Sequence, residues 1–89
     1  MRCDVWLFRA RFFKSRGLAG KIIQKGAVRI VRGEKVARLS KPAAPIRPGD
    51  QLVLRLGADP LRFTVLSLPD RRGPAPEAQA SYSLVSDAE

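Results

Sequence analysis

The chain has 89 residues, with 17 Lys and Arg against 8 Asp and Glu, which gives a formal net charge of +9 and a pI near 11.1. This length allows one domain with a thin core, and a hydrophobic fraction of 45% argues against wholesale disorder. The absence of histidine and the single cysteine exclude a histidine base, a zinc site and an internal disulfide, so we expect no enzyme, metal or cofactor.

The positive charge is concentrated in the first half of the chain. Residues 1–41 carry twelve Lys and Arg against two acids, whereas residues 42–89 carry five against six. This balance favours a polyanionic partner, nucleic acid first and an anionic membrane surface second. Because no apolar run is long enough for a membrane span or a secretory signal, we expect a cytoplasmic protein without a membrane segment.

The first predicted element is a short helix over residues 2–10. Its apolar residues recur at the spacing of one helical face, and they are Cys3, Trp6, Leu7 and Ala10. Trp6 is predicted to lie in the core, with a stacking platform for a base as the alternative. Asp4 has basic neighbours, so we expect a structural ion pair or a helix cap there rather than a catalytic group.

The second predicted helix covers residues 16–25. Ser15 is a good N-cap because its hydroxyl can accept a hydrogen bond from the first turn, and Gly26 stands where a left-handed stop belongs. The apolar stripe of this helix consists of Leu18, Ala19, Ile22 and Ile23. The cations Lys14, Arg16, Lys21 and Lys25 lie outside it. The helix therefore offers cations and a free N-terminus, which attracts phosphate through its N–H groups and dipole.

The loop before this helix combines aromatic and cationic side chains. Phe8, Phe12 and Phe13 are predicted to pack between the two helices, although one of them could instead stack on RNA. From Arg9 to Arg32 there is no acid at all, whereas a merely solvated face usually mixes both signs. We therefore expect a binding surface here, although charge alone does not separate RNA from DNA.

The rest of the chain has the pattern of short strands joined by turns. Residues 28–36 are predicted to form a hairpin that turns at Arg32-Gly33, with Arg29 pointing away from the core on the side that faces the basic helix. A loop with three prolines over residues 38–48 precedes two further strands, at residues 51–56 and 61–68. The residues predicted to face the core are Leu52, Leu54, Leu56, Leu61, Phe63, Val65 and either Leu66 or Leu68.

The C-terminal part is predicted to be an extension of the main domain. Residues 71–76 are expected to be extended and stiffened by proline, residues 77–84 to form a short helix, and the last five residues to fray. We divide the chain into a main domain over residues 1–68, which carries the basic surface, and a basic, proline-containing extension over residues 69–89.

Several segments resemble the S-four RNA-binding domain, a module shared by ribosomal small-subunit protein four, pseudouridine synthases and bacterial tyrosyl-tRNA synthetases. The matching segments are residues 2–8, 10–19, 26–30 and 46–50. The start Arg-x-Asp-x-Trp-Leu and the loop Arg-Phe-Phe-Lys-Ser-Arg are the specific part of this likeness. Residues 71–80 resemble the stand-alone bacterial branch called heat-shock protein fifteen.

The resemblance implies an α+β fold in which two N-terminal helices pack on a small, mostly antiparallel sheet, the alpha-L RNA-binding fold, followed by a short C-terminal helix or tail. It implies that RNA lies across the second helix and the first hairpin. The family uses the positions of Arg2, Arg11, Lys14, Arg16 and Arg29 for RNA contact. Together with the charge pattern, the predicted RNA-binding residues are Arg2, Arg11, Lys14, Ser15, Arg16, Lys21, Lys25, Arg29 and Arg32.

The function implied by the resemblance is binding of ribosomal RNA or tRNA on the large ribosomal subunit. In this family setting, the protein helps to rescue subunits stalled with a nascent chain still attached to tRNA. The alternatives are a detached RNA-docking accessory of an RNA-modification enzyme, and a protein that binds DNA or an anionic membrane through charge alone. We expect the chain to be a monomer.

Overall fold

The computed structural model describes residues 1–85, which form an α+β fold with three helices and five strands. The helices are α1 (Cys3–Arg9), α2 (Arg16–Gln24) and α3 (Ala75–Gln79). The strands are β1 (Val28–Arg32), β2 (Lys35–Arg38), β3 (Gln51–Leu54), β4 (Leu61–Val65) and β5 (Tyr82–Leu84). The predicted fold class is confirmed.

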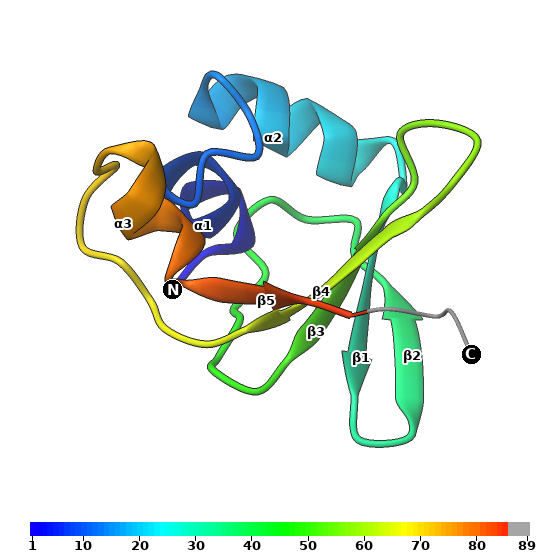
Figure 1. Cartoon of the computed structure of the whole chain (residues 1–89). Coiled ribbons are helices and arrows are strands. Elements are labelled where there is room, and N and C mark those ends of the chain that lie inside the picture. Colours follow the sequence, from blue (N-terminus) through cyan, green and yellow to red (C-terminus); the bar gives the residue numbers. More distant parts are fainter. Residues whose placement is uncertain (86–89) are drawn as a thin grey trace.

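The strands form one sheet in the order β2-β1-β3-β4-β5, and every neighbouring pair is antiparallel. Helices α1 and α2 pack against each other, and Figure 1 shows the three helices gathered at one end of the sheet. The hairpin of β1 and β2 extends away from them (Figure 1). The predicted hairpin over residues 28–36 is thus present, and it continues to residue 38.

The core lies between α1, α2 and one face of the sheet. The strands contribute alternate residues to it, and these are Val28, Ile30, Leu52, Leu54, Phe63 and Val65. The predicted face of α1 is confirmed, because Cys3, Trp6, Leu7 and Ala10 are all buried. Burial, helped by the nearby charge of Asp4, raises the pKa of the Cys3 thiol to about 12.

An aromatic cluster joins α1 to the sheet. Trp6 is fully buried, its Nε1 donates to the carbonyl oxygen of Ser67 at 2.9 Å, and its ring stacks on Phe63 at 5.6 Å. The ring of Phe12 stacks on that of Phe63 with their centroids 4.3 Å apart, and the ring centroid of Tyr82 from β5 lies 4.7 Å from that of Phe12. Trp6 is therefore a core residue, and the alternative of a base-stacking platform is wrong for it.

Several apolar residues predicted to be buried are exposed. The buried face of α2 centres on Ala19 and Ile23, so Leu18 lies at its margin and is 45% exposed. Leu56 is exposed because β3 ends at Leu54 and the chain has already turned away from the sheet. Of the two residues predicted as alternatives after β4, Leu68 packs against the core and Leu66 is exposed.

The predicted terminal helix over residues 77–84 is only partly correct. Helix α3 ends at Gln79, and the chain then forms β5, which pairs with β4 through Phe63 and Leu84, Thr64 and Ser83, and Val65 and Tyr82. The sequence Tyr82-Ser83-Leu84 extends because Tyr82 packs in the aromatic cluster. Most of the last five residues, predicted to fray, lie outside the described part of the chain, and a domain boundary after residue 68 stays a prediction.

Candidate nucleic-acid interface

Asp4 in the first turn of α1 holds two arginines of the predicted site in place. Its carboxylate accepts hydrogen bonds from Arg2 Nε at 3.0 Å and Nη2 at 3.1 Å, and from Arg16 Nε at 3.1 Å. The backbone N–H of Val5 donates to the same carboxylate at 2.8 Å. The predicted structural ion pair is confirmed, and it fixes the start of the chain against the start of α2.

The charge state of Asp4 follows from these contacts. The residue is 4% exposed, and burial by itself raises the pKa of a carboxyl group. The hydrogen bonds from Arg2, Arg16 and Val5, with the positive charge of Arg16, outweigh burial and hold the pKa of Asp4 below its usual 3.8. At neutral pH one carboxylate is therefore set against two guanidinium groups.

An open hollow of about 440 Å³ lies beside this ion pair, and we call it the basic groove. It is lined by Arg2, Asp4, Arg16, Gly17, Gly20, Lys21, Gln24 and Pro42. The side chains of Arg2 and Arg16 are 47% and 51% exposed, so both keep surface open to a ligand while they bond to Asp4. Three cations and one carboxylate make a net positive surface of the kind that binds phosphate.

The N-terminus of α2 lies at the edge of the basic groove. Ser15 caps it as predicted, because its Oγ accepts from the backbone N–H of Leu18 at 3.1 Å. The first turn contains no acid, and the positive end of the helix dipole therefore adds to the charge of Arg16. Gly17 and Gly20 carry no side chain on the surface that lines the groove, which leaves room for a ligand there.

A second arginine–aspartate pair connects the hairpin to the loop that follows it. Arg32 Nε and Nη2 donate to the Asp50 carboxylate at 2.9 and 2.7 Å, and Nη2 also donates to the carbonyl oxygen of Pro45 at 3.4 Å. The hydrogen bond from Arg32 holds the pKa of Asp50 below 3.8 against the opposing effect of burial. Because Pro45 also forms a β-bridge with Arg2, this loop links the two ion pairs.

Arg11 has a role in the fold that its position in a basic loop did not indicate. It lies in the left-handed region with φ of 68°, and its Nε donates to the carbonyl oxygen of Gly73 at 2.6 Å. Arg9 makes a similar contact, since its Nη1 donates to the carbonyl oxygen of Pro69 at 3.0 Å. Both arginines thus tie the end of α1 to the segment before α3.

Arg72 completes this attachment from the other side, a contact that no sequence pattern indicated. Its Nε donates to the carbonyl oxygen of Phe8 at 3.1 Å, and its Nη2 donates to that of Phe13 at 3.3 Å. The guanidinium also lies over the Phe8 ring, 4.9 Å from its centroid. The segment was predicted only to be extended, basic and stiffened by proline, with no contact assigned to Arg72.

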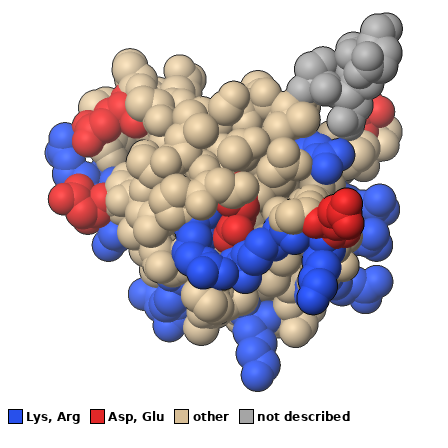
Figure 2. Space-filling model, turned by 90° about the horizontal axis from the view of Figure 1, so that it is seen from below, with Lys and Arg blue, Asp and Glu red and all other residues tan. Residues whose placement is uncertain are grey.

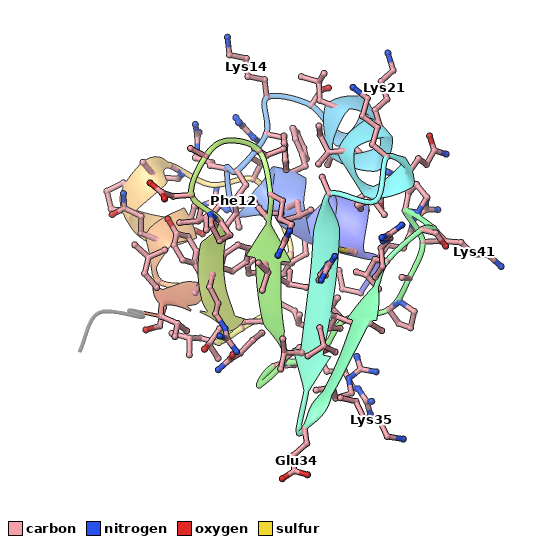
Figure 3. All side chains as sticks on the ribbon, turned by 90° about the vertical axis from the view of Figure 1, so that its right-hand side faces the viewer. Phe12, Lys14, Lys21, Glu34, Lys35 and Lys41 are labelled. Atoms are coloured by element: carbon pink, nitrogen blue, oxygen red, sulfur yellow. The ribbon has the colours of Figure 1, made fainter. Side chains whose placement is uncertain are left out.

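The lysines of the predicted site lie before, within and at the end of α2. Figure 3 shows Lys14 and Lys21 projecting from the body of the molecule at the helical end, whereas Lys35 lies near Glu34 at the opposite end. Lys25 is the C-cap residue of α2, so the helix separates it from Ser15. Lys21 borders the basic groove directly, and Lys14 extends the positive surface beyond it.

Arg29 points away from the core, as predicted, but it does not face the basic helix. Its neighbours in β1, Val28 and Ile30, are buried against the helices, so alternation along the strand sends Arg29 to the opposite face. Figure 3 looks onto that face, with the strands in front and α1 behind them. The predicted location of Arg29 beside the basic helix is therefore wrong.

Cations are not spread evenly over the face that Figure 2 shows. Seen from below, Lys and Arg gather over the lower half of the visible face, with a few acids among them, while the upper centre carries no charged side chain (Figure 2). The structure brings Arg2, Arg16 and Lys21 together at the basic groove. It separates them from Arg11, which is bonded to the C-terminal segment, and from Arg29 on the open face of the sheet.

Comparison with known proteins gives the relatives of this chain, although no family model matches it. A Heat shock protein 15 homolog of Haemophilus influenzae is 37% identical over 82 residues, and Heat shock protein 15 of Escherichia coli is 34% identical over 88 residues. The trimeric structure of Vibrio cholerae Heat Shock Protein 15 matches with a TM-score of 0.81 at 35% identity, covering 97% of this chain and 82% of that one. The chain belongs to the heat shock protein 15 family.

The chain spans only part of the longer members of the heat shock protein 15 family. The matches cover 92% and 99% of this chain but 59% and 62% of the Haemophilus and Escherichia proteins. The Vibrio member is trimeric in its structure, so the expectation that this chain is a monomer receives no support from that relative. Membership confirms the branch that residues 71–80 predicted, while the wider S-four resemblance stays a prediction.

Two kinds of feature are absent from the described residues 1–85. Within residues 1–85, no group of three His, Cys, Asp or Glu side chains lies close enough together to hold a metal ion. None of the helices in this part of the chain combines the length and the apolar character needed to cross a bilayer.

Proposed function

We propose that this member of the heat shock protein 15 family binds RNA and holds the RNA backbone in the basic groove. The observation that supports this most directly is the arrangement of Arg2 and Arg16, whose side chains share one buried carboxylate at 3.0 to 3.1 Å and stay half exposed. Guanidinium groups held in this way lose little side-chain entropy when they donate further N–H groups to a phosphate.

The RNA is ribosomal RNA or tRNA on the large ribosomal subunit. The resemblance of residues 2–8 and 10–19 to the S-four RNA-binding domain supports this target. In the cytoplasm, the protein binds large subunits that stalled with a nascent chain attached to tRNA and helps to clear them. Its part in this process is binding rather than catalysis.

Binding is led by phosphate and by the shape of the RNA. Double-stranded RNA keeps its base edges in a deep, narrow groove that side chains do not read, so contacts go to phosphates and 2′-hydroxyls. If about five to six phosphates are neutralised, the logarithm of the association constant should fall with the logarithm of salt concentration at a slope of about −4 to −5. A nearly flat salt response would contradict binding through the groove.

The first prediction concerns Arg16. The Arg16→Ala variant should bind fragments of large-subunit ribosomal RNA about ten-fold or more weakly at every sequence tested, because it removes a phosphate donor but no base contact. Fluorescence anisotropy at several salt concentrations measures both the affinity and the salt slope. Co-sedimentation with free large subunits then tests whether the same residue matters on the ribosome.

Lys35→Ala is the matched control for this experiment. Lys35 is an exposed cation at the end of the molecule opposite to Lys21 (Figure 3), so its loss removes one charge without touching the groove. Thermal unfolding of both variants shows whether they are folded. If Arg16→Ala and Lys35→Ala weaken RNA binding equally, the groove is not the binding site and only net charge matters.

A further inference from the structure

We propose that the open face of the sheet is a second binding surface for the RNA backbone, separate from the basic groove. This inference rests on the proposed RNA binding and adds a second contact to it. It differs from the single surface across the second helix and the hairpin that the S-four resemblance implies. The residues that carry it are Arg29 and Arg55.

Strand register places the relevant side chains on one face. Val28 and Leu54 are paired residues of β1 and β3, and both are buried on the helical side. The next pair, Arg29 and Val53, therefore points to the other side, and Val53 is in turn paired with Arg62 of β4. This row crosses three neighbouring strands on the face that the helices leave uncovered.

A hollow of about 240 Å³ lies over this row. Arg29, Arg55 and Arg62 line it together with Val31, Val36, Val53 and Pro60, and none of these described lining residues is acidic. Arg55 follows β3 and is exposed, and its backbone N–H donates to the carbonyl oxygen of Ala27 at 2.8 Å, which fixes its place in the sheet. The hollow therefore combines an apolar floor with cationic walls.

The Nε of Arg29, which lines this hollow, lacks a hydrogen-bond acceptor within the described protein. This atom is also buried. A buried donor without an acceptor is costly, and more so when it belongs to a charged group. An anion that enters the hollow supplies the missing acceptor, and a small rotation of the side chain presents its Nε–Nη edge to a phosphate in the usual two-point arrangement.

The neighbouring arginines of the sheet decide which donors remain for an anion here. Arg29 and Arg38 stand directly opposite each other in β1 and β2, an arrangement that is unfavourable for like charges. Arg38 is turned toward the end of α2, because its Cδ lies 3.0 Å from the point where a Cβ on Gly26 would be. Arg62 donates to Gln51 at 3.1 Å, so Arg29 and Arg55 are left as the donors for a ligand.

The hollow suits a nucleic-acid backbone better than a compact anion. A nucleotide chain offers phosphates for the two arginines and sugar surface for the three valines, whereas an acidic peptide has no rigid spacing that fits a row across strands. The basic groove lies at the helical end of the molecule, and this hollow lies on the opposite side of the sheet. One protein would therefore contact two segments of folded RNA.

The test measures, for three proteins, how many RNA hairpins bind and how steeply RNA affinity depends on salt concentration. Wild type, the Arg29→Gln/Arg55→Gln variant and the Arg16→Gln/Lys21→Gln variant are titrated with a labelled 16-base-pair RNA hairpin and with a large-subunit ribosomal RNA fragment. We expect wild type to bind two hairpins and each variant to bind one. On the fragment, the sheet-face variant should lower the magnitude of the salt slope by about 2, one unit for each lost phosphate contact.

The Lys35→Gln/Lys41→Gln variant is the matched control, since it removes two exposed cations that line neither surface. Circular dichroism checks that each variant is folded, and Arg55→Gln alone replaces the double variant if Arg29→Gln unfolds the chain. If the sheet-face variant still binds two hairpins with an unchanged slope, the second surface is refuted while RNA binding stands. If wild type binds no RNA, the proposed RNA binding and the second surface are both refuted. Anionic vesicles are titrated as a further probe, and a sheet-face variant that loses binding to vesicles but not to RNA would refute RNA as the ligand of this face.

Discussion

The behaviour of single residues depends on whether a cation is paired inside the protein or left for a partner. Arg2, Arg16 and Arg32 are each bonded to a buried aspartate, whereas the buried Nε of Arg29 has no acceptor within residues 1–85. The sequence shows the number of cations but not their partners, since Arg16 and Asp4 are twelve positions apart. A paired arginine is held rigidly at the surface, and that rigidity is what a binding site for phosphate needs.

The second prediction, at the residue scale, concerns Asp4. Asp4→Asn should lower the free energy of unfolding at pH 7 by about 2 kcal/mol, because it weakens the charged hydrogen bonds to Arg2 and Arg16. A carboxyl whose pKa is lower in the folded chain stabilises it above its unfolded value of 3.8, and this contribution is lost as pH falls through the folded pKa. The difference between wild type and variant should therefore shrink below pH 3.8.

Urea unfolding at pH 7, 5, 4, 3 and 2 measures this difference. Asp50 is present in both proteins, so its own response to acid cancels. Asp59→Asn serves as the control, because Asp59 is exposed in the loop before β4. This variant should show the same free energy of unfolding as wild type at every pH. A difference that is constant from pH 7 to pH 2 would show that the Asp4 carboxylate does not stabilise the fold.

At the scale of elements, α2 combines a weak helical sequence with a strong cap. Ser15 and Gly26 were predicted to bound it, and both predictions are confirmed, since Ser15 caps the N-terminus and Gly26 has φ of 82°. Caps are local, so sequence reveals them well. The buried face was less predictable, because the margin at Leu18 depends on how far α1 extends along α2, which is a property of packing and not of periodicity.

The third prediction concerns Gly17 in α2. A Cβ there would lie 3.8 Å from Ser15 Oγ and meet nothing closer, so Gly17→Ala should raise the free energy of unfolding by up to about 1 kcal/mol through helix propensity. The same methyl group projects into the basic groove and should weaken RNA binding. Thermal unfolding and RNA titration of one sample measure both effects. Gly57→Ala, in an open loop, should leave RNA affinity unchanged, and a Gly17 variant with wild-type affinity would show that RNA does not approach this turn.

Whole-molecule features were the hardest to predict. The α+β class and the antiparallel sheet followed from alternation and from the family resemblance, and both are confirmed. The strand β5 was missed because three residues carry too little periodicity, and its place beside β4 depends on the packing of Tyr82 against Phe12. The split between the basic groove and the open sheet face was missed because strand register, not composition, decides on which side Arg29 lies.

The fourth prediction, at the scale of the whole molecule, tests how the C-terminal segment is attached. Arg72→Met keeps the apolar stem but removes donors to the carbonyl oxygens of Phe8 and Phe13, so the free energy of unfolding should fall by about 2 kcal/mol. Arg71→Met is the adjacent control, because the ion pair of Arg71 and Glu77 is exposed. Loss of this pair should lower the free energy of unfolding by less than about 1 kcal/mol. Equal effects of the two variants in urea unfolding would show that Arg72 does not anchor this segment.

The burial of Cys3 has a consequence for the chemistry of the protein under oxidative stress. A thiol with a pKa of about 12 is almost entirely protonated at neutral pH, and the thiolate is the form that attacks peroxide. Because Cys3 is also covered on every side, sulfenic acid and mixed disulfides should arise only in chains that have opened. The sole cysteine of the chain thus stays reduced for as long as α1 remains packed on the sheet.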